Sequence, residues 1–304
     1  MSDALRIVSL LPSATELAVA LGLQNNLVGR SHECDFPPAV TALPICTSTK
    51  LEKGLSSQAI EDRVKAIVEK GLSVYDVDAA LLKLLRPDVI LTQAQCAVCA
   101  VTPADLEEAL ATWVGTPPKL VSLAPDDLAD VFGDVHRVAV AAGVPERAPD
   151  AVARMKAGLG ALPAAPRARP KMLAVEWMEP LMVAGNWVPE LITAAGADPL
   201  LADPGTHSHW IEFGSIAAAD PDIIALMPCG YQLAQTLPEA RALLAQPCWQ
   251  GLRAVRDGRV FAVDGHHLFN RPGPRLVESA EVLACLIHSP DAVPESLRGF
   301  IAKV

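Results

Sequence analysis

Two stretches of the chain, LRPDVILTQAQC at residues 85–96 and ADPDIIALMPCG at residues 219–230, follow the same plan. Each begins at the end of an expected helix and continues through Pro-Asp into an apolar run that is followed by a cysteine. Continuous apolar runs of this length are typical of parallel strands, which are buried on both faces. The repetition therefore predicts an α/β protein with two similar lobes, each built on a parallel sheet.

Further strands and helices are expected on either side of these two stretches. Apolar runs predict strands at 6–11, 27–31, 88–93, 119–124, 171–177, 222–228 and 259–265. Helical patterns predict helices at 13–22, 57–70, 76–86, 103–113 and 274–289. Two consecutive helices precede the proline-rich segment 163–170. We therefore expect an N-terminal lobe at 1–145, a linker helix at 146–163 and a C-terminal lobe at 164–304.

The composition limits the partners of the protein. The chain has 304 residues and a formal net charge of −10, so no basic stripe is present that would bind nucleic acid or anionic lipid. The opening MSDALRIVSLLPSATELAVALG has no basic segment before its apolar run, and no run of about 18 apolar residues predicts a membrane span. The seven cysteines form no regular framework, which favours reduced or metal-bound thiols. We expect a cytoplasmic protein without membrane insertion, or a periplasmic one if a signal was removed.

Four of the cysteines follow predicted strands. In open parallel sheets, ligands bind outside the carboxyl ends of the strands, and two facing lobes would share one cleft there. Four thiolates at one edge would complete a tetrahedral zinc site or hold an iron–sulfur cluster, with His32 as a spare nitrogen ligand. A redox pair and small core residues are the alternatives for the Cys-x-x-Cys spacing. The candidate metal ligands are Cys34, Cys96, Cys99 and Cys229.

Aromatic residues also gather after the strands of the second half. Each one taken singly is core filler, but as a group in a chain that is only 4% aromatic they indicate a wall for a flat or bulky apolar ligand. They are Trp177, Trp187, Trp210, Tyr231 and Phe269. Ser13 follows the first strand, where its hydroxyl either caps a helix or helps to hold an anion. No nucleophile elbow, P-loop, HExxH or GxGxxG motif is present, so the sequence favours binding over catalysis, and enzymatic activity stays open.

The opening RIVSLLPSATELAVALGLQNNLVGRSHECDFP resembles that of the cobalamin-binding, BtuF-like substrate-binding proteins of ABC transporters. The stretches LRPDVILTQ, AAADPDIIALMPCG and GRVFAVDGHHLFNRPGPRLVESAEVL extend the resemblance over nearly the whole chain. It implies the class III fold, two Rossmann-like lobes joined by one long helix, with a corrinoid such as cobalamin, or another tetrapyrrole-like ligand, held between them. With this ligand in view, the candidate binding residues are Ser13, His32, Asp35, Phe36, Trp177, Trp187, Trp210, Tyr231, Phe269, Asn270 and Arg271.

Members of this family present one glutamate per lobe to arginines of the membrane permease. Counting from the two Pro-Asp strand starts, these positions fall on Ala80 and Gly214, although Asp78 and Glu212 lie close by. The resemblance therefore makes a permease partner doubtful. Three hypotheses follow: an intracellular binding protein for a corrinoid-like ligand, a cysteine-ligated metalloprotein with redox or enzymatic use, and an exported binding protein.

Overall fold

The computed structural model describes residues 4–51, 55–68, 74–93, 106, 113 and 116–304. The chain forms two compact units. The first comprises residues 1–55, 59–125 and 129–154, and the second comprises residues 56–58, 126–128 and 155–304. The division falls inside helix α6 (Ala148–Gly160). Among the described helices, none combines the length and the apolar character needed to cross a membrane.

The first unit is built on a parallel four-stranded sheet in the order β2-β1-β5-β6. Its strands are β1 (Ile7–Ser9), β2 (Leu27–Arg30), β5 (Val89–Gln93) and β6 (Lys119–Leu123). Strand β3 (Thr47–Thr49) pairs with β4 (Tyr75–Val77) in a separate antiparallel two-stranded sheet. The helices are α1 (Pro12–Ala20), α2 (Ser57–Val68) from Ala59 onward, α3 (Ala79–Leu85), α5 (Leu128–Ala141) from Ala129 onward, and the start of α6. The predicted parallel sheet of this half is confirmed. The helix predicted at 103–113 lies outside the described residues except for Leu106 and Trp113.

The second unit has a seven-stranded sheet whose longer path runs β10-β8-β7-β11-β12-β13. Three central strands are parallel: β7 (Lys171–Met178), β11 (Ile223–Leu226) and β12 (Val260–Val263). The short strands β8 (Leu181–Val183), β10 (His209–Trp210) and β13 (Ile301–Lys303) run antiparallel to their neighbours, with β10 and β13 at the two ends of the path, and β9 (Asp198–Pro199) pairs parallel to β7. None of these four short strands is predicted above, because two or three residues are too few to show a strand pattern.

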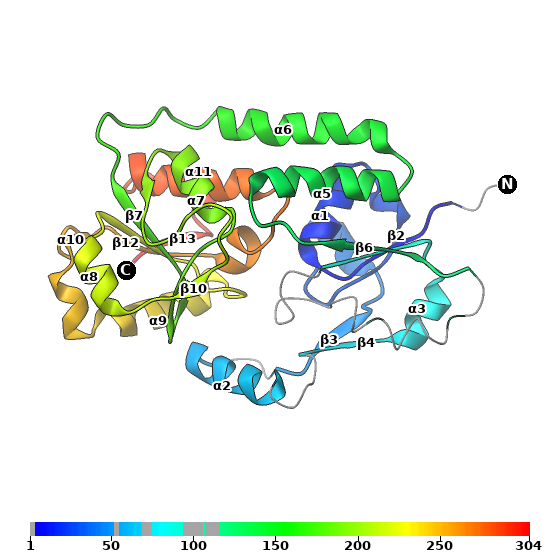
Figure 1. Cartoon of the computed structure of the whole chain (residues 1–304), viewed down its shortest axis with the longest axis horizontal. Helices are drawn as coiled ribbons and strands as arrows, with labels where there is room; N and C mark the ends of the chain where they lie inside the picture. Colours follow the sequence, from blue (N-terminus) through cyan, green and yellow to red (C-terminus); the bar gives the residue numbers. More distant parts are fainter. Residues whose placement is uncertain (1–3, 52–54, 69–73, 94–105, 107–112, 114–115) are drawn as a thin grey trace. The chain divides into compact units, whose positions relative to one another are not determined.

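The helices of the second unit are α7 (Val188–Ala195), α8 (Phe213–Ala219), α9 (Leu233–Leu244), α10 (Arg253–Arg256) and α11 (Leu276–His288). Helices α7 and α11 lie side by side (Figure 1), and α9 packs on β12. The core between sheet and helices includes Leu173, Ile224 and Trp249, all at most 1% exposed. Burial of each such side chain stabilises the fold by about 1.5–3 kcal/mol. These central strands and the covering helices confirm the predicted α/β class.

The Pro-Asp repeat has a physical explanation in both units. Helices α3 and α8 are each seven residues long and end in a left-handed residue, Arg86 with φ 43° and Asp220 with φ 42°. The proline that follows prevents the helix from continuing. The aspartate then ties the new strand to its neighbour: Asp88 Oδ2 accepts the backbone N–H of Arg6 at 2.8 Å, and Asp222 Oδ2 accepts that of Lys171 at 2.8 Å.

One element was predicted wrongly. The helix expected at 76–86 begins only at Ala79, because residues 75–77 form strand β4 and Asp78 caps α3 by accepting the backbone N–H of Leu81. Pairing of β4 with β3 is a tertiary contact between segments about 28 residues apart, and it overrides the local helical pattern.

Candidate functional site: the strand ends of the second unit

The carboxyl ends of β7, β11 and β12 carry most of the candidate residues of the second unit. These strands are adjacent and parallel, so Glu176, Cys229 and Asp264 come to the same edge of the sheet. The backbone N–H of Cys229 donates to the carbonyl of Glu176 at 3.0 Å, which joins the first two strand ends. The backbone N–H of His266 donates to the carbonyl of Tyr231 at 3.0 Å, which joins the loops after the second and third.

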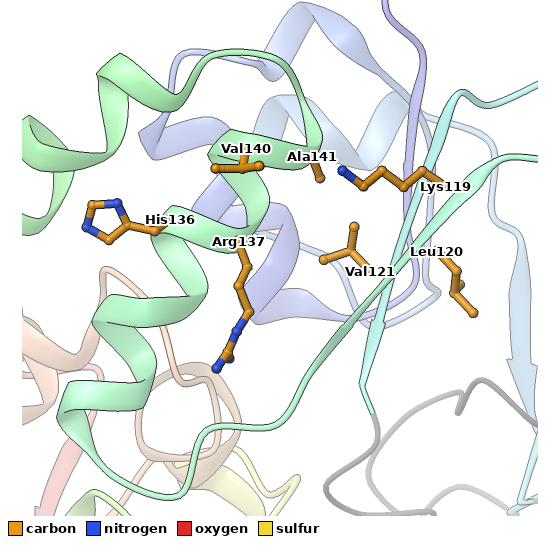
Figure 2. Close-up of a pocket in the computed structure, with 7 residues that line it drawn as sticks. All are labelled: Lys119, Leu120, Val121, His136, Arg137, Val140 and Ala141. Atoms are coloured by element: carbon orange, nitrogen blue, oxygen red, sulfur yellow. The ribbon is translucent and has the colours of Figure 1, made fainter.

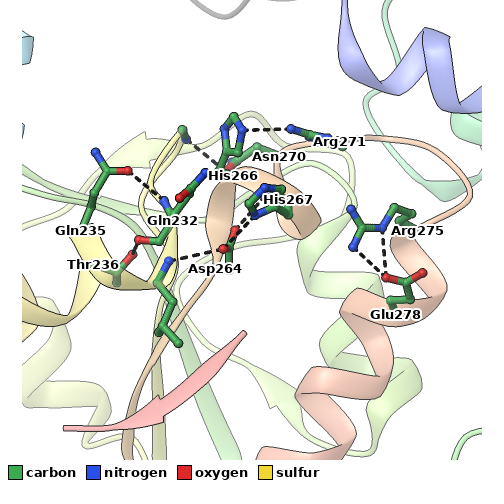
Figure 3. A network of polar contacts seen from close by, with 12 residues as sticks. Gln232, Gln235, Thr236, Asp264, His266, His267, Asn270, Arg271, Arg275 and Glu278 are labelled. Carbon is green, nitrogen blue, oxygen red and sulfur yellow. Dashed lines mark hydrogen bonds and ion pairs between the residues drawn. The ribbon is translucent and has the colours of Figure 1, made fainter. Parts of the chain in front are cut away.

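A π-helical turn, Gly265–Phe269, follows β12 and presents two adjacent imidazoles (Figure 3). Such turns are rare and are frequently found at functional sites. Gly265 is required here, because a Cβ at this position would lie 2.3 Å from the carbonyl oxygen of Pro228 and 2.8 Å from that of Met227. The turn is therefore packed directly on the end of β11.

Asp264 anchors this turn. Its carboxylate accepts the backbone N–H of His267 at 2.8 Å, the Nδ1–H of His267 at 2.9 Å and the backbone N–H of Leu233 at 3.3 Å (Figure 3). Burial alone would raise the pKa of Asp264, but these hydrogen bonds and the charge of His267 outweigh it and lower the pKa. The group is therefore a buried carboxylate anion near neutral pH.

The second imidazole of the turn has a different partner. Arg271, which is 3% exposed, donates from Nη2 to Nε2 of His266 at 3.0 Å (Figure 3). Asn270 accepts the backbone N–H of Gly230 at 3.4 Å through Oδ1. Arg271 and Asn270, two of the candidate ligand contacts, thus belong to the same polar network as the two histidines.

The predicted aromatic wall divides into buried and exposed members. The rings of Trp177 and Tyr231 meet edge to face at 5.6 Å, and the Nε1–H of Trp187 donates to the carbonyl of Phe269 at 3.0 Å. All four side chains are at most 7% exposed, whereas Trp210 on the edge strand β10 is 52% exposed. The structure therefore buries four of the five rings, in the two contacting pairs Trp177–Tyr231 and Trp187–Phe269, and it leaves Trp210 exposed on the edge of the sheet.

Two polar pairs support the same edge. Glu176 accepts the hydroxyl proton of Ser208 at 2.7 Å, and Ser208 Oγ accepts the backbone N–H of Gly185 at 2.9 Å. Tyr231 donates from its hydroxyl to Glu239 at 3.3 Å, and the backbone N–H and hydroxyl of Ser57 donate to the same carboxylate at 3.0 and 2.5 Å. Burial and the nearby Glu239 raise the pKa of Tyr231, so its hydroxyl stays protonated at neutral pH.

The candidate residues of the first unit form a second, smaller network. The hydroxyls of Thr47 and Ser31 are hydrogen-bonded at 3.1 Å, and Nδ1 of His32 lies within hydrogen-bond distance of Thr47 Oγ1, at 2.8 Å. The His32 ring also lies 5.7 Å from the ring of Tyr75. Ser13 is buried in the first turn of α1. Asp35 is partly buried and Phe36 is 37% exposed.

The cysteines are only partly described. Cys34 is fully buried in the first unit, where Thr15 donates to its Sγ at 3.0 Å, and Cys229 is partly exposed in the second unit. Cys96 and Cys99 lie outside the described residues. The four-cysteine metal site therefore stays a prediction.

A hollow of about 400 Å³ is present on the first unit (Figure 2). It lies between β6 and α5 and is lined by Lys119, Leu120, Val121, His136, Arg137, Val140 and Ala141. Arg137 pairs with Asp134 of the same helix. The lining is largely apolar, and none of the residues predicted to bind ligand contributes to it.

Comparison with known proteins identifies the family. The model of the family described as "Periplasmic binding protein" matches residues 7–266. The chain belongs to this family. The uncharacterized ABC transporter substrate-binding lipoprotein YvrC of Bacillus subtilis is 26% identical over 296 residues, which cover 95% of this chain and 82% of that protein.

Solved structures share the fold. The periplasmic vitamin B12 binding protein BtuF of Vibrio cholerae matches with a TM-score of 0.61 and 19% identity, covering 93% of this chain and 96% of the other. A periplasmic heme binding protein from Pseudomonas aeruginosa matches with a TM-score of 0.64 and 23% identity, covering 97% and 96%. The resemblance to BtuF-like binding proteins and the class III fold are thereby confirmed.

Several residues of the site were not among the candidates. His266 and His267 follow the predicted strand 259–265 in the sequence, and their position after a strand was the available signal, whereas Asp264 lies within that predicted strand. Glu239 lies in the middle of α9, Thr47 begins the short strand β3, and Ser208 directly precedes the short strand β10. Glu239, Thr47 and Ser208 can be recognised as part of the site only from their contacts in the folded protein.

Proposed function

We propose that the protein is a solute-binding protein that holds a corrinoid or a related metal tetrapyrrole at the strand ends. Family membership makes it a binding protein of the periplasmic type. The observation that carries the choice of ligand is the strand-end cluster of the second unit, where buried aromatic rings adjoin the polar network of Asp264, His266, His267 and Arg271. Aromatic side chains supply flat apolar surface, and arginine and histidine suit the carboxylate or amide groups at the rim of such a ring.

A permease is the proposed partner. The relative from Bacillus subtilis is named as a substrate-binding lipoprotein of an ABC transporter. This name supports docking to a permease, whereas Ala80 and Gly214 at the expected glutamate positions led us to doubt it. Two carboxylates lie near those positions: Asp78 precedes α3 and Glu212 precedes α8, and both are exposed. They occupy the same place relative to the two Pro-Asp repeats and are the candidates to replace the missing glutamates.

Ligand titration tests the binding function. Purified protein is titrated with cyanocobalamin, dicyanocobinamide and hemin, with heat and visible absorption as readouts. We expect saturable binding of at least one of the three, weakened in Arg271→Ala and unchanged in the control Arg137→Ala on the first unit. Absence of heat and of any spectral change with all three compounds would contradict the proposal. Cell fractionation tests the cytoplasmic location predicted from the N-terminal sequence.

A further inference from the structure

The hollow between β6 and α5 has the size of a small-molecule site. Its volume of about 400 Å³ falls within the range of about 300–1,000 Å³ that is usual for ligand pockets. Lys119 and Val121 extend from the strand toward the helix, and Val140 and Ala141 face them from α5 (Figure 2). All of these residues belong to the first unit, and none of them is part of the strand-end cluster described above.

Val140 gives α5 an apolar side chain outside the stripe that packs on the core. The core stripe is formed by Val131, Val135 and Val138, each at most 1% exposed. Val140, in contrast, is 57% exposed. A ligand that covered Val140 would remove its side chain from water, which is favourable in proportion to the apolar area buried.

The charged and titratable side chains of the lining are all basic. They are Lys119, His136 and Arg137. The guanidinium of Arg137 is paired with the carboxylate of Asp134 on the same helix. Within the part of the chain that the structure describes, no side chain forms an ion pair with the ammonium group of Lys119. In a chain with a net charge of −10, this hollow therefore combines an apolar wall with a cation that is not neutralised.

These features select a singly charged amphipathic ligand. A lysine ammonium forms a strong, charge-assisted hydrogen bond with a carboxylate. Phosphate groups are typically bound at helix N-termini, whereas the hollow lies against the last turns of α5, which ends at Ala141. The negative end of the helix dipole lies there, and it disfavours a doubly charged anion more than a singly charged one.

We propose that the hollow binds a small amphipathic monocarboxylate, such as a medium-chain fatty acid. The carboxylate pairs with Nζ of Lys119, and the alkyl chain lies against Val121 and Val140. Binding forms only non-covalent contacts. The inference goes beyond the proposed function and uses none of its residues, so the failure of either one leaves the other standing.

Two probes that differ in charge test the proposal. Octanoate and 1-octanol have alkyl chains of the same length, but only octanoate carries a carboxylate. The full chain is titrated with each, with calorimetry for the affinity and the NMR signals of the valine methyl groups for the location. The variants are Lys119→Ala and Val140→Trp. The matched controls are Lys171→Ala, at the first residue of β7 as Lys119 is of β6, and Leu84→Trp, at an exposed position of α3.

We expect octanoate to bind saturably and to shift the methyl signals of Val121 and Val140. Lys119→Ala should weaken octanoate about fivefold, as for loss of a well-placed exposed ion pair, and should leave the affinity for octanol unchanged. Val140→Trp should abolish the binding of both probes, because the indole ring would fill the hollow. Both control variants should bind octanoate as native protein does.

Three results would overturn the proposal. One is octanoate binding that does not saturate, or that leaves the methyl signals of Val121 and Val140 unmoved. Another is an unchanged octanoate affinity in Lys119→Ala or in Val140→Trp. The third is an equal loss of octanoate and octanol binding in Lys119→Ala, because the lysine would then support the fold rather than bind the carboxylate.

Discussion

Gly265 is the position where a single methyl group should test the architecture of the site most directly. An alanine Cβ there would lie 2.3 Å from Pro228 O, 2.8 Å from Met227 O and 3.0 Å from Asn270 Oδ1. Two of these three atoms belong to the backbone at the end of β11, which cannot move without disturbing the parallel pairing of β11 with β7 and β12. Overpacking of this kind costs about 1–3 kcal/mol, and we expect the upper end of that range because the obstacle is backbone.

The assay is urea denaturation of the Gly265→Ala variant, followed by the fluorescence of the tryptophans of the second unit. The matched control is Gly214→Ala on α8, where a Cβ would meet nothing within 4 Å and where alanine should stabilise the helix by up to about 1 kcal/mol. Ligand binding should weaken in Gly265→Ala, because the turn that carries His266 and His267 must shift. A Gly265→Ala protein as stable as native, or equal losses in the two variants, would refute this reasoning.

Three further predictions concern other parts of the chain. Burial raises the pKa of Asp134 to about 6 despite its pairing with Arg137, so the stability contributed by its protonated form is lost as the pH rises from about 4 through 6. The unfolding free energy of Asp134→Asn, measured in denaturation curves, should therefore rise relative to that of native protein by up to about 3 kcal/mol between about pH 4 and pH 7. A difference between the two proteins that does not change with pH would contradict this prediction. Trp187→Phe removes the donor to the carbonyl of Phe269 and should cost about 1–3 kcal/mol, whereas Trp210→Phe, on an exposed edge strand, should change the same free energy by less than about 0.5 kcal/mol. If the cysteines bind zinc or an iron–sulfur cluster, metal analysis of purified protein should find stoichiometric metal, and the metal content should be lower in the Cys34→Ser variant. Purified protein without metal would contradict that hypothesis.

Much of the fold was predictable because its signals are local. The Pro-Asp repeat marks the end of a helix and the start of a buried strand in both units, and the structure confirms both strands. The short strands β8, β9, β10 and β13 were not predictable, because two or three residues gain their conformation from pairing rather than from their own pattern. The same holds for β4, whose residues were expected to belong to a helix.

The candidate site was predictable to a smaller extent. Position after a strand was enough to nominate Tyr231, Phe269 and Arg271, because the carboxyl ends of parallel strands lie at one edge. It could not show that Asp264 holds His267 while Arg271 holds His266, since these contacts depend on the π-helical turn. Nor could it distinguish the buried Trp187 from the exposed Trp210, because the exposure of a side chain depends on what packs against it in the folded protein.

The sequence was sufficient to predict the α/β class and the strand ends at which candidate binding residues collect. These features depend on apolar patterns and proline positions that can be recognised within a few consecutive residues. The tertiary structure alone decided which side chains meet there and in which protonation state. Asp264 is an anion because the side chain and backbone N–H of His267 and the backbone N–H of Leu233 all act on one buried carboxylate. Such a balance of burial and hydrogen bonding exists only once distant segments have been brought together.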